Sequence, residues 1–238
     1  MFRASLIFIL LFLSCTPLSA QVYWDEFGQY DATGFGGASV GGNFNFSTSV
    51  SGSTLEANRN VGMRYANGYQ LGASVGERLD DFWGAELEYT FANQPLRFTN
   101  LSPTIQSLAL SHLVHRLTYN ISFAPPMPTK RFRPYGKAGV GTALFYITGD
   151  SKEQALQSGL KLRDSWEIAF TAGGGFKYLF TDIAALTFDV RDQMSPVPSY
   201  GLPRTAQVVN GQFQPGFSHK GWFHSWQFGF GIAFQWNE

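Results

Sequence analysis

Residues 225–236 read SWQFGFGIAFQW, and this stretch decides the fold class. Large apolar side chains alternate along it with small or polar ones. The large ones are Trp226, Phe228, Phe230, Ile232, Phe234 and Trp236, and the others are Ser225, Gln227, Gly229, Gly231, Ala233 and Gln235. A period of two predicts a β-strand with one apolar face and one small or polar face. The length also suits a strand that crosses a membrane, which needs about 9–11 residues.

The same alternation recurs in seven earlier stretches of the chain. They fall at residues 38–46, 69–76, 83–91, 113–123, 135–145, 166–178 and 186–191. The resulting total is even, as a closed bacterial barrel requires. No stretch after the N-terminal segment is apolar enough for a membrane helix, so we expect insertion to use strands. The sequence therefore predicts an all-β fold, an eight-stranded antiparallel transmembrane up-and-down β-barrel.

Short turns alternate with long polar connections between these stretches. The short turns are expected near residue 80 and at 125–128 and 181–182, and the long connections at 47–66, 149–165 and 193–221. Outer-membrane barrels keep short turns at the periplasmic end and long loops at the cell surface. We therefore expect the connections at 149–165 and 193–221 to be exposed and dispensable for folding.

Composition indicates that the apolar face of the wall contacts lipid. Charged residues make up 14% of the chain, well below the roughly 25% of an ordinary soluble domain. The other face is rich in glycine, alanine and serine, which suits a narrow lumen better than a solvated strand surface. We therefore expect Phe188, Phe228 and Phe230 to face lipid. The formal net charge is zero, so nothing in it indicates nucleic-acid binding.

This choice of face places eight charged side chains inside the barrel. They are Glu86, Glu88, Arg116, Lys137, Glu167, Lys177, Asp189 and Arg191. Buried charges must be paired to be tolerated, so we expect a structural ion network that fills the lumen. Within it, Arg116 is expected to neutralise Glu86 or Glu88 across neighbouring strands.

The remaining charges are expected to pair near the last strands, with Glu167 or Lys177 beside Asp189 or Arg191. The alternative interpretation of these charges is a polar conduit or a site for a small ligand. Eight strands enclose an interior only wide enough for side chains or one small ligand. An open pore is therefore not expected.

The N-terminal segment carries the features of a cleaved signal peptide. Arg3 gives a positive start, an apolar run follows, and Leu-Ser-Ala precedes Gln21 as a small-residue cleavage site. The expected organisation is a signal peptide at residues 1–20, a leader at 21–34 and the barrel domain at 35–238. Cys15 leaves open the alternative of a lipoprotein instead of cleavage after Ala20.

Three stretches resemble the OmpA-like outer-membrane β-barrel family, also called the porin family. Residues 133–146 read RPYGKAGVGTALFY and are similar to that family's Pro-Tyr-x-x-x-Gly-x-Gly strand. Residues 172–192, AGGGFKYLFTDIAALTFDVRD, resemble its glycine-rich penultimate hairpin. The last strand is similar to the signal read by the barrel-assembly machinery. The residues that fit this signal are Gln227, Gly229, Ile232 and Phe234.

The resemblance implies a monomeric protein of the bacterial outer membrane. It implies outer-membrane lipid and lipopolysaccharide as its surroundings, insertion by the assembly machinery, and no cofactor. The expected role is non-enzymatic: structural, adhesive or a surface interaction. Two departures from the family pattern matter. The chain ends Trp236-Asn237-Glu238 instead of on an aromatic residue, so we expect the last two residues to lie beyond the wall. We also expect no peptidoglycan-binding domain after the barrel.

An outer-membrane acyl hydrolase is the enzymatic alternative, because His219, His224 and Ser225 lie near the last strand. Adjacent residues on a strand point opposite ways, so His224 is not expected to activate Ser225. The spacing of His112 and His115 likewise puts them on opposite faces, which argues against a metal pair. We therefore predict no catalytic and no metal-binding residues.

Overall fold

The computed structural model describes residues 27–48, 59–99, 107–125, 127, 129, 131–158, 160–202, 207–209, 212–214 and 221–237. The predicted signal peptide, its cleavage before Gln21 and the alternative lipid attachment at Cys15 lie outside these residues. Within them, no helix is long and apolar enough to cross a membrane.

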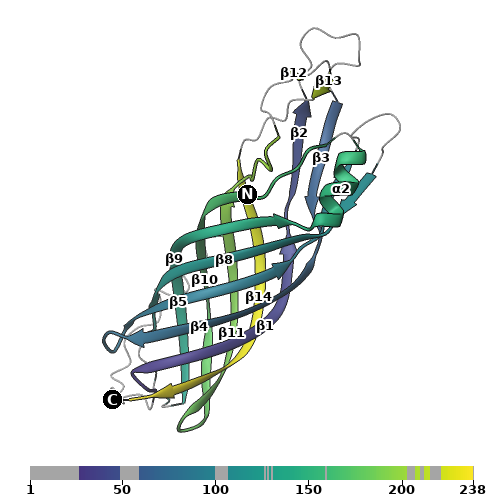
Figure 1. Ribbon diagram of the computed structural model, residues 1–238. Coiled ribbons are helices and arrows are strands. Elements are labelled where there is room, and N and C mark those ends of the chain that lie inside the picture. The colour runs from purple at the N-terminus through teal and green to yellow at the C-terminus, as the bar shows by residue number, and fades with distance from the viewer. Residues whose placement is uncertain are drawn as a thin grey trace.

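Eight antiparallel strands close a barrel, which confirms the predicted fold class. They are β1 (Tyr30–Gly41), β4 (Gly68–Arg78), β5 (Trp83–Asn93), β8 (His112–Phe123), β9 (Phe132–Ile147), β10 (Ser165–Thr181), β11 (Ala184–Pro196) and β14 (Trp222–Trp236). The order around the wall is β1-β14-β11-β10-β9-β8-β5-β4 (Figure 1). β1 closes the wall, because it pairs with both β14 and β4.

The barrel wall begins at an earlier residue than predicted. β1 starts at Tyr30, which stands opposite Trp236, so the predicted boundary between leader and barrel at Phe35 is wrong by five residues. The apolar positions of this first segment are filled by Ala32 and Gly34, whose small size hides the period of two. The ladder with both neighbouring strands still holds the segment in the wall.

The two faces of the wall agree with the predicted orientation. Every second residue of β14 from Phe223 to Gln235 is buried, and the residues between them are exposed. Phe188, Phe228 and Phe230 point outward, with 37%, 41% and 59% of their surface exposed. The prediction that these three phenylalanines lie on the outer face is confirmed.

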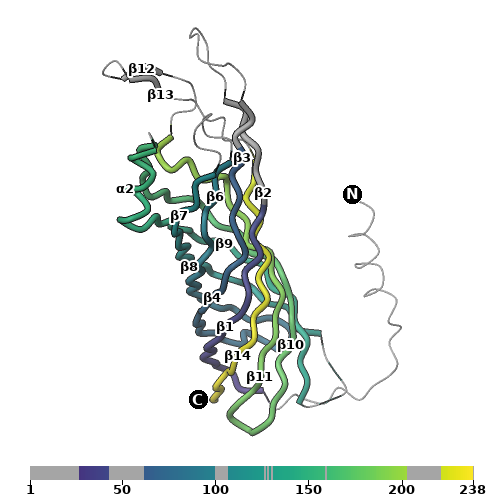
Figure 2. Tube along the Cα trace, turned by 90° about the vertical axis from the view of Figure 1, so that its right-hand side faces the viewer, coloured from purple at the N-terminus to yellow at the C-terminus, as the bar shows by residue number. Residues whose placement is uncertain are grey.

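Four further strands continue the wall beyond the barrel, at the end that carries the long connections. They are β2 (Asn43–Thr48), β3 (Arg59–Tyr65), β6 (Leu96–Thr99) and β7 (Ser107–Leu110), in the order β2-β3-β6-β7. Helix α2 (Gly149–Gln157) lies beside β7 in both views (Figures 1 and 2). We call these four strands and α2 the extension. A separate hairpin pairs β12 (Gln207–Val209) with β13 (Gln212–Gln214).

The expectation that residues 149–165 and 193–221 are exposed is wrong for several of the described residues in both connections. Several of their apolar side chains are buried in one cluster with apolar residues of the extension. Those from the connections are Ala155, Leu160, Leu162, Val197, Tyr200 and Leu202. Their spacing follows neither a strand nor a long helix, so periodicity did not reveal them. They are buried because the extension has an apolar face that would otherwise meet water.

Candidate functional site

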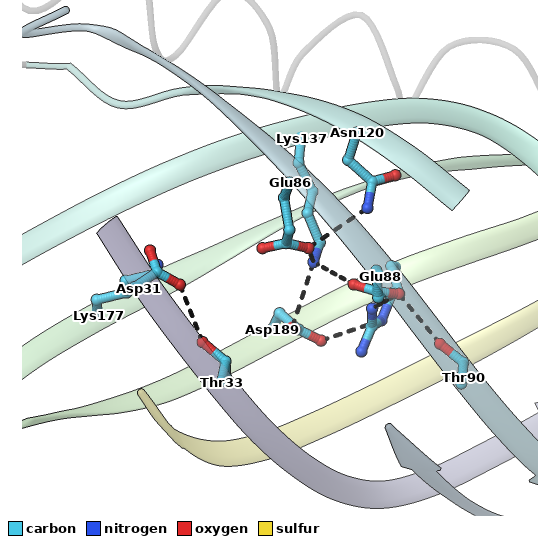
Figure 3. Close-up of polar contacts among 10 residues, drawn as sticks. Asp31, Thr33, Glu86, Glu88, Thr90, Asn120, Lys137, Lys177 and Asp189 are labelled. Atoms are coloured by element: carbon cyan, nitrogen blue, oxygen red, sulfur yellow. Dashed lines mark hydrogen bonds and ion pairs between the residues drawn. The ribbon is translucent and has the colours of Figure 1, made fainter. Parts of the chain in front are cut away.

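Five charged side chains from three strands meet in the half of the lumen nearest the short turns. They are Glu86 and Glu88 of β5, Lys137 of β9, and Asp189 and Arg191 of β11, and we call them the ion network (Figure 3). The Lys137 Nζ atom lies 2.7 Å from Glu88 Oε2, 3.0 Å from Glu86 Oε1 and 3.9 Å from Asp189 Oδ2. One ammonium group therefore serves three carboxylates.

Arg191 is the second cation of the network. Its Nη1 atom pairs with Glu88 Oε1, and its Nε atom lies 3.3 Å from Asp189 Oδ1. The guanidinium carbon also stands 4.4 Å from the centre of the Phe35 ring, a cation–π contact inside the lumen. The side chains of Glu88 and Arg191 are completely buried. This pair therefore obstructs the lumen at the level of Phe35.

Glycines on the neighbouring strands make room for this cluster. Gly175 and Gly229 stand opposite Asp189, and Gly173 stands opposite Arg191. A Cβ atom at Gly229 would lie 2.7 Å from Asp189 Oδ1, and one at Gly173 would lie 2.7 Å from Arg191 Cβ. Any larger residue would push the charged side chains away from their partners. The close approach therefore depends on these glycines.

Arg116 lies in the lumen and is only 2% exposed, but its predicted pairing with Glu86 or Glu88 is wrong. The register sets Arg116 opposite Thr90, whereas Glu88 stands opposite Thr118. Within the part of the chain that the structure describes, neither terminal nitrogen of Arg116 has a hydrogen-bond partner. The pairing was predicted because β5 and β8 are neighbouring strands. Their register, however, places Arg116 one lumen-facing row away from Glu88.

The pairing predicted for Lys177 and Glu167 with charges of β11 is also wrong. The Lys177 Nζ atom pairs with Asp31 Oδ2 at 2.6 Å, at the start of β1. That partner lay in the segment expected to precede the barrel. Glu167 Oε1 accepts a hydrogen bond from the Ser165 hydroxyl at 2.8 Å. None of the ion pairs among the described residues includes Glu167.

A small cavity lies below the ion network, at the end of the lumen that carries the short turns. Its lining includes Asp31, Glu86, Arg133 and Lys177, and its volume is about 60 Å³. A buried water needs about 10–15 Å³ of such space, so the cavity holds a few waters at most. A site for a drug-sized ligand, which needs several hundred Å³, is not supported here.

Aromatic side chains close the opposite end of the lumen. They are Tyr65, His112, Phe145, Tyr200 and Phe223, all fully buried, and we call them the aromatic cap. The ring centres of Tyr65 and Phe223 are 4.4 Å apart, and those of His112 and Phe145 are 5.8 Å apart. These rings come from β3, β8, β9, β14 and the segment after β11. The cap therefore ties the extension to the barrel wall.

A chain of hydrogen bonds orders the cap. The His112 Nδ1 atom lies 3.0 Å from the Gln94 carbonyl oxygen and must donate to it. The Nε2 atom of the neutral ring then accepts from the Tyr200 hydroxyl at 2.9 Å. Tyr65 in turn donates to the Tyr200 oxygen at 2.5 Å. Burial raises the pKa of both tyrosine hydroxyls, so they remain protonated donors.

The residues of the enzymatic alternative do not form a catalytic pair. Ser225 points into the lumen, where its hydroxyl lies 3.1 Å from that of Ser39. His224 points outward and its Nδ1 atom lies 2.6 Å from Asp192 Oδ2. The histidine therefore has an orienting carboxylate but lies on the other side of the wall from the serine. The third candidate, His219, lies outside the described residues.

The structure also shows which face of the wall carries the two other groups of residues singled out in the sequence. His112 and His115 lie on opposite faces of β8, as predicted, and His115 Nδ1 is 2.7 Å from the Tyr89 hydroxyl on the outer face. Of the predicted assembly-signal residues, Gln227 and Gly229 face the lumen, whereas Ile232 and Phe234 are on the outer face. Their use by the assembly machinery stays a prediction.

The geometry defines the class of the protein: a small closed barrel with an apolar outer wall and a charged lumen, which is a transmembrane barrel of the bacterial outer membrane. The chain belongs to the outer membrane protein beta-barrel domain family, whose sequence profile matches residues 8–234. No curated protein sequence matches the chain.

Two solved structures are similar to this chain. The outer membrane protein OprG from Pseudomonas aeruginosa is 19% identical, with a TM-score of 0.55, and the match covers 89% of this chain and 99% of that one. Neisserial surface protein A is 13% identical, with a TM-score of 0.47, covering 87% of this chain and 96% of that one. At this level of identity the first match shows the fold alone.

Periodicity did not predict the aromatic cap or most of the extension. β3 and α2 lie in the predicted connections 47–66 and 149–165, and no strand was expected at β6 or β7. A signal was present at residues 96–99 and 107–110, where Leu96, Phe98, Leu108 and Leu110 alternate with polar or small residues. Runs of four residues are too short to separate from loop by periodicity. Tyr200 carried no pattern at all, because it stands alone between turn residues.

Proposed function

We propose that this protein acts at the cell surface through its extension, and that the barrel below serves as a closed, non-enzymatic anchor. The single observation that carries the proposal is the shared core of the extension. Tyr65, Phe98 and Leu110 of its strands pack in one cluster with Phe145 and Phe223 of the barrel. A loop that only connects two strands needs no such core. The extension is thus a rigid surface, on which binding residues can be presented.

The lumen argues for an anchor and against a wide pore. The ion network and the aromatic cap block it at two levels, and an interior of eight strands is already narrow. At the cap, Tyr65, Phe145 and Phe223 leave no exposed surface. The proposal includes a monomeric barrel surrounded by outer-membrane lipid and lipopolysaccharide.

Two measurements on the full chain test this proposal. In planar bilayers, the purified protein should show no steady ohmic conductance, in contrast to a porin in the same bilayer. In cells that display it, replacing residues 96–110 by a tight turn should abolish autoaggregation or adhesion to a surface, while the barrel still inserts and resists heat. Lys161→Gln, a change to an exposed residue outside these strands, is the matched control. Steady conductance, or adhesion that survives the replacement, would contradict the proposal.

A further inference from the structure

Two arginines stand directly opposite each other on the exposed face of the extension. Arg64 of β3 pairs in register with Arg97 of β6, and both side chains are exposed. Directly opposite residues in an antiparallel pair have Cβ atoms only about 4.5–5.5 Å apart. Like charges in this position repel each other and destabilise the sheet. An anion between the two guanidinium groups would relieve this repulsion.

The described strands of the extension offer no such anion. The four strands of the extension read NFNFST, RNVGMRY, LRFT and SLAL, with three arginines and no carboxylate. The next residue across the sheet from Arg97 is Ala109. Among the described residues, neither Arg64 nor Arg97 takes part in any ion pair. The positive charge of this face is therefore uncompensated.

The arginine pair lies on the lipid side of the wall. Leu96 and Phe98 are buried in the core of the extension, so Arg97 between them faces the opposite way. Because β5 and β6 keep the same alternation, this is also the side on which the barrel exposes Leu87 and Tyr89. The pair therefore faces whatever surrounds the barrel just above the membrane.

The height of the pair matches a lipid headgroup. Tyr69 is exposed on the outer wall and accepts a hydrogen bond from the Asn93 side chain at 3.5 Å. Such aromatic residues mark the interface between hydrocarbon and headgroups. Arg97 follows Asn93 by four residues, which at about 3.3 Å per residue and a tilt of about 40° raises it roughly 10 Å above this level. The headgroup region extends about 5–8 Å beyond the hydrocarbon, so the pair stands at its outer edge, where the guanidinium groups can reach headgroup phosphates.

We propose that Arg64 and Arg97 together bind a phosphate group of the outer-leaflet glycolipid, lipopolysaccharide. Two guanidinium groups can each direct paired N–H donors at phosphate oxygens, the geometry for which arginine is better suited than lysine. The bound phosphate also removes the repulsion between the two arginines. The site fixes how deep the extension sits in the outer leaflet. It does not depend on what the extension binds at the cell surface.

Titration of the full-length protein in zwitterionic micelles with lipopolysaccharide tests this site. Arg64→Gln and Arg97→Gln should each weaken binding about 5-fold, which is the effect of one basic residue near an anionic lipid surface, and the double variant should weaken it about 25-fold. The matched control is Lys161→Gln, which removes an exposed cation from the segment between α2 and β10 and should leave the affinity within 2-fold. Replacing both arginines by lysine should recover only part of the affinity.

A second readout separates binding from a merely structural role. Without lipopolysaccharide, Arg97→Gln should leave the Tm unchanged or raise it, because the repulsion is relieved. With lipopolysaccharide, the same variant should gain less in Tm than the parent. Chemically dephosphorylated lipopolysaccharide should stabilise the parent and the double variant equally.

Three outcomes would overturn the proposal. Equal affinity of the parent and the double variant would show that the pair does not bind the lipid. An equal loss in the Lys161→Gln control would show attraction by overall charge only. Displacement of lipopolysaccharide by inorganic phosphate at low millimolar concentration would show a site for free phosphate instead of a lipid.

Discussion

Two layers of the lumen differ in how they treat buried polar groups. In the ion network, each of the five charged side chains has an ion-pair partner. In the layer between the network and the aromatic cap, Gln70, Arg116 and Gln193 are buried, and their terminal polar atoms have no hydrogen-bond partner among the described residues. The two layers follow each other along the same strands. Along β11, for example, the next lumen-facing residue after Arg191, toward the aromatic cap, is Gln193.

The space beside a strand determines whether buried polar side chains can reach a partner inside this barrel. In the lower layer, Asp189 stands between Gly175 and Gly229, which leaves room for the long side chains of Lys137 and Arg191 to converge. In the upper layer, Gln193 stands between Thr171 and Ser225, and no such row of glycines exists there. Buried polar groups without protein partners are normally satisfied by internal water. We therefore expect internal water beside the unpartnered polar groups of the upper layer.

Removing Lys137 should break the lower layer and give the largest effect. Lys137→Met leaves three carboxylates with Arg191 as their remaining cation in the network. Loss of one partner of a buried pair costs about 3–5 kcal/mol, because the other charge stays buried without compensation. Reversible urea unfolding in lipid vesicles, followed by tryptophan fluorescence, should show a loss of this size.

The double variant Lys137→Met with Glu86→Gln is the control for this effect. It removes one of the stranded carboxylates and should recover part of the lost free energy. Unfolding of Lys137→Met at the parental urea concentration would mean that the ion network does not stabilise the barrel, and the contrast between the two layers would disappear.

Filling the space beside Asp189 should destabilise the lower layer without removing a charged group. Gly229→Ala puts a methyl group 2.7 Å from Asp189 Oδ1, and overpacking of this kind costs about 1–3 kcal/mol. Gly34→Ala is the matched control, because a Cβ at that outward position meets nothing within 4 Å. It should change the unfolding free energy by less than about 0.5 kcal/mol. Equal effects of the two substitutions would contradict the role of this space.

The aromatic cap bounds the upper layer, and loosening it should have a local effect. Tyr200→Phe removes the hydrogen bonds to His112 and Tyr65, which are worth about 1–2 kcal/mol together. Limited proteolysis should cut the long connections faster, while heat resistance of the barrel stays. Tyr119→Phe, at an exposed position of the outer wall, should not alter the cleavage rate. Unchanged proteolysis of Tyr200→Phe would contradict the proposed role of the cap.

The sequence predicted the wall well and the contacts inside it poorly, for a physical reason. Alternation follows from the geometry of a single strand, so a run such as Trp226 to Trp236 reveals both its structure and its outer face. All eight predicted inward charges are buried or half-buried in the structure. Pairing depends on register and tilt between strands, which no local pattern encodes.

The extension was missed for a related reason. Its strands β6 and β7 have four residues each, and its core includes Tyr200 from a segment without periodicity. Such residues are buried only because distant segments meet. The proximity of Arg64 and Arg97 could not be predicted from sequence either, because they become neighbours only through the pairing of β3 with β6.

The smallest expected effect separates the two layers most sharply. Arg116 is as deeply buried as Lys137, so a rule based on burial alone predicts an equal loss when either charge is removed. The structure predicts otherwise, because neither terminal nitrogen of Arg116 has a hydrogen-bond partner among the described residues that its removal would strand. An unpaired buried charge is costly to desolvate, so replacing it by an apolar side chain of similar volume should not destabilise the barrel. Arg116→Met should therefore shift the unfolding free energy by less than about 1 kcal/mol. Combined with Lys137→Met, its effect should simply add, because the two side chains share no contact. A loss of several kcal/mol, rescued by Glu88→Gln, would show that Arg116 pairs with the network after all.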